Sequence, residues 1–333
     1  MKAFVTGATG FVGSAVVRSL LRRGSSVRVL ARPSSDLSNI ADLDVEVFYG
    51  DLLDSGSMLR ALQGCDTLYH VAAHYSTNEA DSRTMYEVNV RGTQVVMRAA
   101  LKVGVQRAVH TSTIGTIGQP ADGSLATEET PFALWETASH YVKSKYLGEV
   151  AALRLGQAGL PVVVVHPCAP VGPRDSEPTS TGQRLLDYLH GKSPSFVPGG
   201  INFIAVDDVA EGEVLAAEKG RVGERYILGH RDGNLRLADF YALMERASGV
   251  KPPPIPRDSL PARVARHSRL IQSLLGRPKA QARDPGSAKR GYGVPMALTC
   301  DPSKAIRELG LPQTPLATAI ATAVRWFDEH GYV

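Results

Sequence analysis

Short apolar segments alternate with longer amphipathic segments along the first half of the chain. The short segments are rich in β-branched residues, and the four consecutive valines after Pro161 are the clearest case. The longer segments repeat apolar residues at helical spacing. The pattern predicts strands at 2–6, 27–31, 45–49, 66–71, 107–111 and 161–166, and helices at 11–23, 81–103 and 138–157.

The apolar strands show little of the alternation that a half-exposed strand would have. Strands of this kind are buried on both faces, as in a parallel sheet between two layers of helices. The sequence therefore predicts an α/β fold, a Rossmann-type doubly wound parallel sheet with a smaller C-terminal substrate lobe. Residues 1–166 form the predicted first domain, which carries this sheet. Several prolines follow His166, so 167–200 and 221–333 are assigned mainly to the substrate-binding lobe. A strand at 203–206 and a helix at 207–218 are predicted to return 201–220 to the main sheet.

Composition limits the class of protein. Hydrophobic residues make up 43% of the chain and charged residues 21%, which is an ordinary soluble composition, and no run of 18 apolar residues predicts a transmembrane segment. The first residues read as a strand rather than a signal peptide. Cys65, Cys168 and Cys300 lie far apart in the sequence without metal-site spacing, which favours a reducing, cytoplasmic location. We interpret His70 and His74 as structural and expect no metal.

Basic charge is concentrated in one segment. Residues 251–295 carry ten Lys and Arg against two acids, whereas the rest of the chain carries 27 basic and 31 acidic residues. Within this segment, 261–277 is predicted to be a basic helix with a short apolar stripe. The helix either docks on an anionic membrane surface as a peripheral contact or packs its stripe into the lobe, and the shortness of the stripe favours packing. Nucleic-acid binding is not expected, because aromatic residues are not interleaved with the basic ones.

A glycine-rich turn follows the first predicted strand. Gly7, Gly10 and Gly13 allow the backbone to approach a pyrophosphate, and the next helix directs its free N–H groups and positive dipole end at the same place. The turn predicts that 1–166 is a dinucleotide-binding domain, with a tight turn that binds nothing as the alternative. The residues expected to contact the cofactor here are Gly7, Thr9, Gly10, Phe11, Val12 and Gly13.

The end of the second predicted strand bears on the choice between NAD and NADP. An acid at that position would accept a hydrogen bond from the ribose 2′-hydroxyl of NAD, but the sequence has Ala31 and Arg32. A guanidinium can pair with a 2′-phosphate, so NADP(H) is favoured and NAD(H) stays open. The alternative is that Arg32 is a solvated surface residue.

A tyrosine and a lysine four residues apart provide candidate acid–base chemistry. Tyr141 and Lys145 share one face of a predicted helix, where the ammonium would lower the pKa of the phenol towards working pH. The tyrosine could then exchange a proton while hydride passes to or from nicotinamide. A second match to this spacing, Tyr188 with Lys192, stops at a glycine and follows no strand-end hydroxyl, so we interpret it as coincidence.

These motifs resemble the extended short-chain dehydrogenase/reductase family, also called the NAD-dependent epimerase/dehydratase family. The likeness rests on the G-x-x-G-x-x-G spacing and on 50–52, 70–73, 89–93 and 111–118. Segments 140–149, 167–175, 206–212 and 326–332 resemble its dihydroflavonol-4-reductase-like branch and, within it, bacterial hopanoid-associated sugar epimerases. The resemblance implies a catalytic triad of Thr113, Tyr141 and Lys145, with Ser112 as the fallback hydroxyl. It also implies cofactor contacts from Asp51, Leu52, Ala72, Ala73, Asn89, Lys145 and Pro167.

Three functions are compatible with these residues. The first is an NADP(H)-dependent oxidoreductase that interconverts a carbonyl and a secondary alcohol, which Arg32 favours. The second is a nucleotide-sugar epimerase or dehydratase that retains its cofactor, which Arg174 favours as a candidate diphosphate clamp. The third, a non-catalytic Rossmann sensor, is disfavoured because both Tyr141 and Lys145 are present. Ser112, His166 and Arg174 are the candidate substrate contacts, the substrate is a small hydrophobic or sugar-containing molecule, and the protein is a monomer or homodimer.

Overall fold

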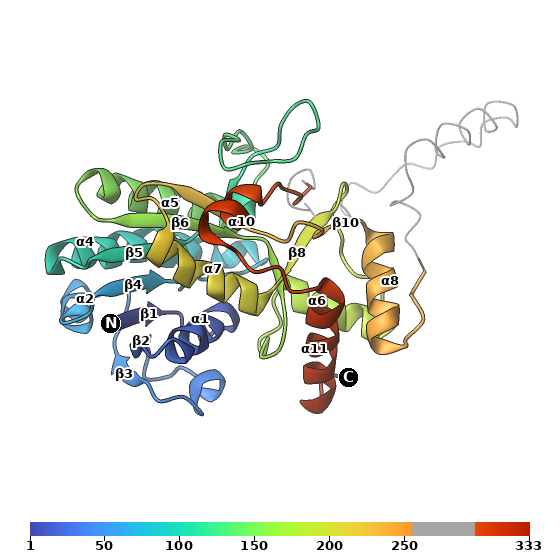
Figure 1. Cartoon of the computed structure of the whole chain (residues 1–333), viewed down its shortest axis with the longest axis horizontal. Helices are drawn as coiled ribbons and strands as arrows, with labels where there is room; N and C mark the ends of the chain where they lie inside the picture. Colours follow the sequence, from blue (N-terminus) through green and yellow to red (C-terminus); the bar gives the residue numbers. More distant parts are fainter. Residues whose placement is uncertain (255–296) are drawn as a thin grey trace, which may run out of the picture.

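A seven-stranded sheet, with all neighbouring strands parallel, forms the centre of the computed structural model, which describes residues 1–254 and 297–333 (Figure 1). The strand order is β3-β2-β1-β4-β5-β6-β9, with the direction of strand addition changing at β1. The predicted doubly wound sheet is therefore confirmed. Its strands are β1 (Lys2–Thr6), β2 (Ser26–Ala31), β3 (Glu46–Tyr49), β4 (Thr67–His70), β5 (Arg107–Thr111), β6 (Val162–Pro167) and β9 (Arg225–Leu228).

Helices cover both faces of this sheet because successive strand residues point to opposite sides. In β1, Ala3 and Val5 join the apolar core beneath α1 and α7, whereas Phe4 joins the core beneath α2, α4 and α5. The run of valines in β6 is divided between the two cores in the same way. These helices are α1 (Phe11–Arg22), α2 (Ser55–Leu62), α4 (Thr93–Val103), α5 (His140–Gln157) and α7 (Val206–Lys219).

A second, smaller sheet forms the centre of a lobe beside the main sheet (Figure 1). Its strand order is β10-β8-β7, and a third apolar core lies between it and the helices of the lobe. The N-terminus lies in the main sheet and the C-terminus lies in the lobe. The elements of the lobe are β7 (Ala169–Val171), α6 (Ser180–Leu189), β8 (Ile201–Ala205), β10 (Asn234–Leu235), α8 (Leu237–Ser248) and α11 (Leu316–Glu329).

The predicted return of 201–220 to the main sheet is wrong for its strand. β8 pairs with β7 and β10, and only α7, which begins at the next residue, packs on the main sheet beside α1. The seventh position is instead filled by β9, from a segment assigned mainly to the lobe, and α10 (Ser303–Leu309) packs beside β9 and α7. The chain thus crosses between the two sheets more often than the sequence predicts.

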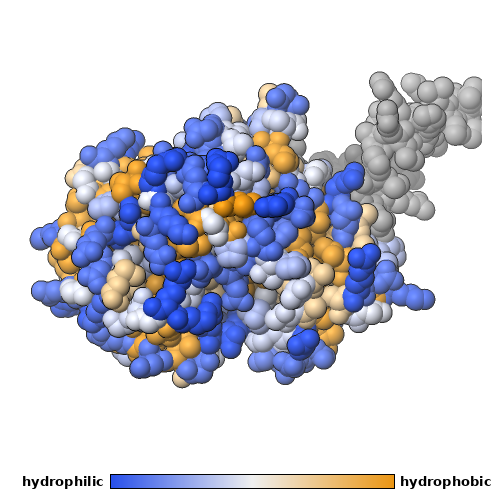
Figure 2. Space-filling model, in the orientation of Figure 1, coloured by the Kyte–Doolittle hydropathy of each residue, from blue (hydrophilic) through white to orange (hydrophobic). Residues whose placement is uncertain are grey.

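The helical stretch predicted at 81–103 consists of three joined pieces. A short helix α3 (Ser82–Tyr86) leads into a π-helical segment, Glu87–Gly92, and then into α4. Cys168 and Cys300 are distant in sequence, yet their sulfur atoms lie 3.3 Å apart in the interior. The predicted basic helix at 261–277 lies outside the described residues. On the face drawn in Figure 2, hydrophilic residues predominate and hydrophobic residues form scattered patches.

Candidate active site

A cleft of about 850 Å³ lies at the carboxyl ends of the main-sheet strands, where it also borders the small sheet. Ligands of open α/β sheets bind at this edge, where the order of strand addition changes direction. The cleft brings together most of the residues predicted from the sequence. They are Gly7, Thr9, Gly10, Phe11, Val12, Gly13, Arg32, Asp51, Leu52, Ala72, Ala73, Ser112, Thr113, Tyr141, Lys145 and Pro167.

The glycine turn is so closely packed that side chains would not fit at two of its three glycines. A Cβ on Gly13 would stand 2.0 Å from the Gly7 carbonyl oxygen, and one on Gly7, whose φ is 73°, would stand 2.6 Å from the Ala72 nitrogen. Gly10 faces open space, with no atom closer than 3.5 Å to such a Cβ. It is also the N-cap of α1 and supplies no side-chain acceptor for the first N–H groups of the helix. These features fit the pyrophosphate of a dinucleotide.

The end of β2 carries a cation in the cleft. Ala31 is buried, whereas Arg32 is exposed. The backbone N–H of Arg32 donates to Ser35 Oγ over 3.1 Å, which fixes a turn at the rim. Among the described residues, no carboxylate lies within ion-pair distance of the Arg32 guanidinium, whereas Arg28, in the same strand, pairs with Glu46. Asp51, from the loop after β3, also lines the cleft and accepts a bond from the Leu53 N–H over 2.8 Å.

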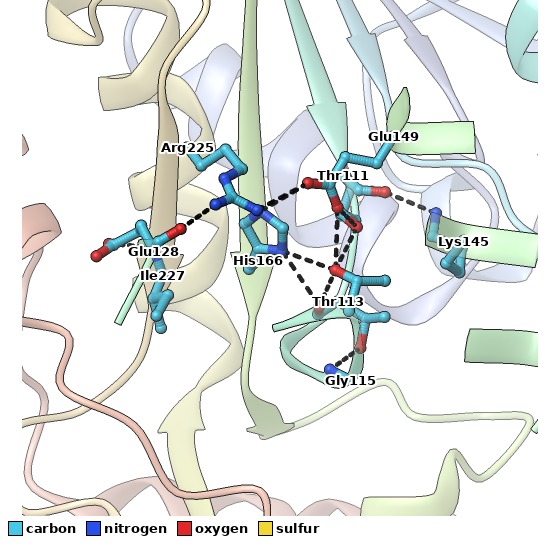
Figure 3. Close-up of polar contacts among 11 residues, drawn as sticks. Thr111, Thr113, Gly115, Glu128, Lys145, Glu149, His166, Arg225 and Ile227 are labelled. Atoms are coloured by element: carbon cyan, nitrogen blue, oxygen red, sulfur yellow. Dashed lines mark hydrogen bonds and ion pairs between the residues drawn. The ribbon is translucent and has the colours of Figure 1, made fainter. Parts of the chain in front are cut away.

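Tyr141 and Lys145 project into the cleft from the first turns of α5. The Lys145 ammonium donates a hydrogen bond to the Thr111 carbonyl oxygen over 2.6 Å, and this bond joins α5 to the end of β5 (Figure 3). Thr113 lies two residues beyond β5, and its hydroxyl oxygen accepts a bond from the Gly115 N–H over 3.3 Å. Tyr75 packs its ring edge-on against that of Tyr141, with ring centroids 4.9 Å apart.

Burial controls the titration of these groups. Burial raises the pKa of Tyr141, and Tyr75 raises it further, which is opposite to the reduction predicted for Tyr141 beside Lys145. Burial lowers the pKa of Lys145 to about 8, against the opposing effect of Glu213 and Glu149.

A buried polar network lies behind the cleft. Glu149 accepts hydrogen bonds from Ser112 over 2.8 Å and from Thr116 over 3.0 Å. Its other carboxylate oxygen lies 3.5 Å from Arg225 (Figure 3). Ser112 is therefore occupied within the protein, which leaves Thr113 as the freer hydroxyl. On the other side of β5, the Thr111 hydroxyl donates to Glu213 over 2.8 Å, and burial raises the pKa of this carboxyl to about 7.

Three predicted site residues lie outside the lining of the cleft. Asn89 is buried and bridges the main chain of His74 to the Ser144 hydroxyl, a supporting position. The expected substrate contact of His166 is not supported, because its ring turns into the network and bonds with Thr116 over 3.1 Å. Arg174 is likewise absent from the lining, so its expected role as a diphosphate clamp is not supported either.

Sequence reasoning missed several polar residues at or behind the cleft. Tyr75 and Arg184 line it, whereas Glu149, Glu213 and Arg225 support it from behind. Glu213 had a detectable signal, since it is a charged residue within the apolar face of α7. Arg184 had none, because an arginine in the helix of a lobe resembles any surface residue.

Other potential sites from the sequence have structural explanations. Tyr188 is buried in α6, where its hydroxyl donates to the Val250 carbonyl over 2.8 Å. Lys192 is exposed, so the two residues do not form a second catalytic pair. The ring of His70 lies between the hydroxyls of Thr6 and Thr93. Within the ranges 1–254 and 297–333, no cluster of three or more His, Cys, Asp or Glu residues is arranged to hold a metal ion. In the same ranges, no helix is long and apolar enough to cross a membrane.

Comparison with known proteins identifies the family. The model of the NAD dependent epimerase/dehydratase family matches residues 3–229. A Synechocystis sp. protein named "Putative dihydroflavonol 4-reductase" is 40% identical over 341 residues, which cover 99% of this chain and 95% of the relative. Sterol demethylase protein B of Methylococcus capsulatus is 36% identical over 343 residues, which cover 100% of both chains. Neither name bears on the hopanoid resemblance, which stays a prediction.

A solved structure gives the same result for the whole fold. The crystal structure of a nucleoside-diphosphate-sugar epimerase from Pseudomonas aeruginosa matches with a TM-score of 0.77 at 26% identity, covering 100% of this chain and 99% of that one. The family model, the relatives and the glycine turn agree on one conclusion. The chain belongs to the NAD-dependent epimerase/dehydratase family, the extended short-chain dehydrogenases/reductases, and is an oxidoreductase-type enzyme of a family that binds a nicotinamide cofactor.

Proposed function

We propose that this enzyme is an NADP(H)-dependent oxidoreductase that interconverts a carbonyl and a secondary alcohol. The observation that carries the proposal is the convergence of Thr113, Tyr141 and Lys145 on one cleft, beside the glycine turn. A hydroxyl, a phenol and an ammonium are the groups needed to orient a carbonyl oxygen and to deliver a proton to it.

Each of the three side chains has one role in the proposed reduction. A nicotinamide held beside the glycine turn would supply the hydride for the carbonyl carbon. Thr113 donates its hydroxyl to the carbonyl oxygen and orients it, while Tyr141 donates the proton that completes the alcohol. The Lys145 ammonium favours the phenolate that remains, and solvent then restores the proton to Tyr141. Oxidation of the alcohol follows the same steps in reverse.

The preference for NADP(H) rests on Arg32. This arginine lines the cleft at the end of β2, where an NAD-binding site would carry an acid, and no described carboxylate neutralises it. A free guanidinium is suited to bidentate pairing with the 2′-phosphate. Asp51 and Leu52 contribute the adenine side, and Ala72, Ala73 and Pro167 contribute the walls beside the cofactor.

Relatives support both the proposal and its alternative. The Synechocystis relative carries a reductase name, whereas the Pseudomonas structure is named as an epimerase. The alternative is a nucleotide-sugar epimerase or dehydratase with retained cofactor. Of this chain's own residues, Arg174 favoured that alternative, and it does not line the cleft. We also infer a cytoplasmic location, with the monomer and the homodimer both open.

Turnover with added cofactor tests the proposal. A small amount of enzyme is mixed with excess NADPH or NADH and a panel of ketones and aldehydes, and consumption of the reduced nucleotide is followed by absorbance. Parallel reactions contain UDP-glucose or dTDP-glucose. We expect many turnovers of NADPH with at least one carbonyl compound and slower turnover with NADH. Conversion of a sugar nucleotide without net consumption of nicotinamide would overturn the proposal in favour of the epimerase.

A further inference from the structure

A second cation lines the cleft on the side of the small sheet. Arg184 lies in α6 and is partly buried, and the proposed catalysis does not use it. Its Nε donates to the Ser195 carbonyl over 2.7 Å, and its Nη1 donates to the Ser180 carbonyl over 2.7 Å. Two main-chain acceptors therefore hold the guanidinium plane in place. No hydrogen bond from Nη2 to a described residue accompanies them.

The charge of Arg184 is not balanced within the described residues. None of the ion pairs among them includes this arginine, whereas other arginines of the chain, such as Arg18 and Arg28, pair with acids. Burial lowers the pKa of Arg184, while the neighbouring Tyr75 and Asp187 oppose the shift. A partly desolvated and fixed guanidinium without an ion-pair partner costs free energy unless an anion binds to it.

Tyr75 links this cation to the proposed reaction centre. Its ring packs against Tyr141, and Tyr75 and Arg184 line the same cleft. Apolar residues from the neighbouring elements line the cleft with them: Val88, Ala169, Pro170, Ile201 and Leu298. The cleft thus combines the fixed cation of Arg184 with apolar residues. Polar residues also line it, among them Glu87, Glu177, Thr179 and Thr181.

We propose that Arg184 binds an anionic group of the substrate, a carboxylate or a phosphate, carried on an otherwise apolar molecule near the carbonyl that is reduced. The inference rests on the proposed function and names its substrate class. Carboxylate and phosphate oxygens both accept charge-assisted hydrogen bonds from a guanidinium, so Arg184 can bind either anion. With Nε and Nη1 held by the protein, Nη2 is the donor offered to the ligand. Arg184 is then a specificity-determining residue that holds the substrate while Tyr141 and Thr113 engage its carbonyl oxygen.

Binding to the cofactor-loaded enzyme tests this assignment. With NADP⁺ bound, the protein is titrated calorimetrically with 3-hydroxydecanoate, with its methyl ester and with UDP. The first two differ in charge and by one methyl group, and UDP distinguishes a diphosphate from a carboxylate. We expect the carboxylate or UDP to bind, and Arg184→Gln to weaken that binding by roughly ten- to hundredfold, the scale of a charge-assisted hydrogen bond. Binding of the ester should change little.

Two further variants separate recognition from folding. Arg184→Lys keeps the charge and should retain part of the anion affinity, and Lys192→Gln removes an equal charge from an exposed position outside the cleft and should retain all of it. NADPH affinity should be the same in all four proteins. Absence of anion binding to the wild type, or equal anion binding by wild type and Arg184→Gln, would overturn the assignment.

Failure of this inference can be told apart from failure of the proposed function. If the enzyme consumes NADPH with neutral ketones and Arg184→Gln does so equally well with charged ones, the anion site is wrong and the reductase stands. If anions bind through Arg184 but no carbonyl compound oxidises NADPH, the anion site stands and the reductase is wrong.

Discussion

The Lys145 ammonium and the Glu213 carboxylate each form a hydrogen bond with one residue, Thr111, at its carbonyl oxygen and its hydroxyl respectively. The Lys145 ammonium donates to the Thr111 carbonyl oxygen over 2.6 Å, and the Thr111 hydroxyl donates to Glu213 over 2.8 Å. Lys145 and Glu213 are both buried. Burial favours the neutral amine, so the Lys145 pKa falls to about 8, and the Glu213 carboxylate opposes that fall. Glu213 therefore helps to keep the lysine charged without touching the cleft.

This relationship predicts a shifted pH profile for Glu213→Gln. Without the carboxylate, the pKa of Lys145 should fall further, so the decline of kcat/KM on the alkaline side should begin at lower pH than in the wild type. The effect belongs to that side of the profile because the Glu213 carboxyl, with a pKa raised to about 7, is ionised only above that pH. Glu218→Gln, on the exposed side of the same helix, is the control. An alkaline limb at the same pH in both variants would refute a role for Glu213.

Removal of the Tyr141 hydroxyl should abolish most turnover. Tyr141→Phe keeps the ring that packs against Tyr75 but removes the proton donor, so kcat should fall by roughly 10²–10⁴ while the Kd for NADPH stays unchanged. Tyr188→Phe is the matched control from the second tyrosine–lysine pair. It loses one hydrogen bond to Val250, about 1 kcal/mol of stability, and should keep its turnover. Full activity in Tyr141→Phe would remove Tyr141 from the mechanism.

Arg32 should determine which nucleotide binds. Arg32→Ala should weaken NADPH binding by about 1.5–3 kcal/mol and leave NADH almost unchanged, because only NADPH carries the 2′-phosphate. Arg22→Ala removes an equal charge from an exposed position on α1 outside the cleft and controls for the net charge. Titration calorimetry with both nucleotides gives the comparison. Equal losses for NADPH and NADH would show that Arg32 supports the fold rather than the phosphate.

Gly10 offers a test of the glycine turn that does not disturb the fold. Gly10→Ala has room in the ligand-free protein, because the nearest atom to the new methyl is 3.5 Å away. The methyl would occupy the space through which a pyrophosphate approaches, so affinity for NADPH should fall by about tenfold, or ~1.4 kcal/mol, with an unchanged melting temperature. Gly56→Ala in α2 serves as the control. Unaltered NADPH affinity would mean that the pyrophosphate does not approach at Gly10.

The sequence predicts the main sheet well because its strands carry their own signal. The valine run of β6 is buried on both faces, and that environment leaves a continuous apolar segment in the sequence. β8 has an equally apolar sequence and every residue of it is buried, yet it joins the other sheet. Its partner depends on the path of the chain after β6, and no local pattern records that path.

The sequence predicts a site residue correctly where local backbone geometry fixes the position of its side chain. It fails where tertiary packing decides which way the side chain points. The glycine turn and the i, i+4 pair of α5 follow from local structure. His166 sits at the end of the correct strand, but its ring points into the interior, where Thr116 and Glu149 meet it. Arg174 follows later in the same segment and does not line the cleft. Arg184 enters the cleft only because the lobe folds over it, which is a tertiary relationship.

Nucleotide content and exchange test the central claim, that this enzyme is an NADP(H)-dependent reductase rather than an epimerase, most directly. The purified protein is denatured, its released nucleotide is identified and quantified by mass spectrometry, and fresh protein is then titrated with NADPH and NADH. We predict little retained nucleotide, reversible binding of NADPH and weaker binding of NADH, because a reductase releases its cofactor after each turnover and Arg32 favours the 2′-phosphate. Near-stoichiometric NAD(H) that survives purification and does not exchange would contradict the account.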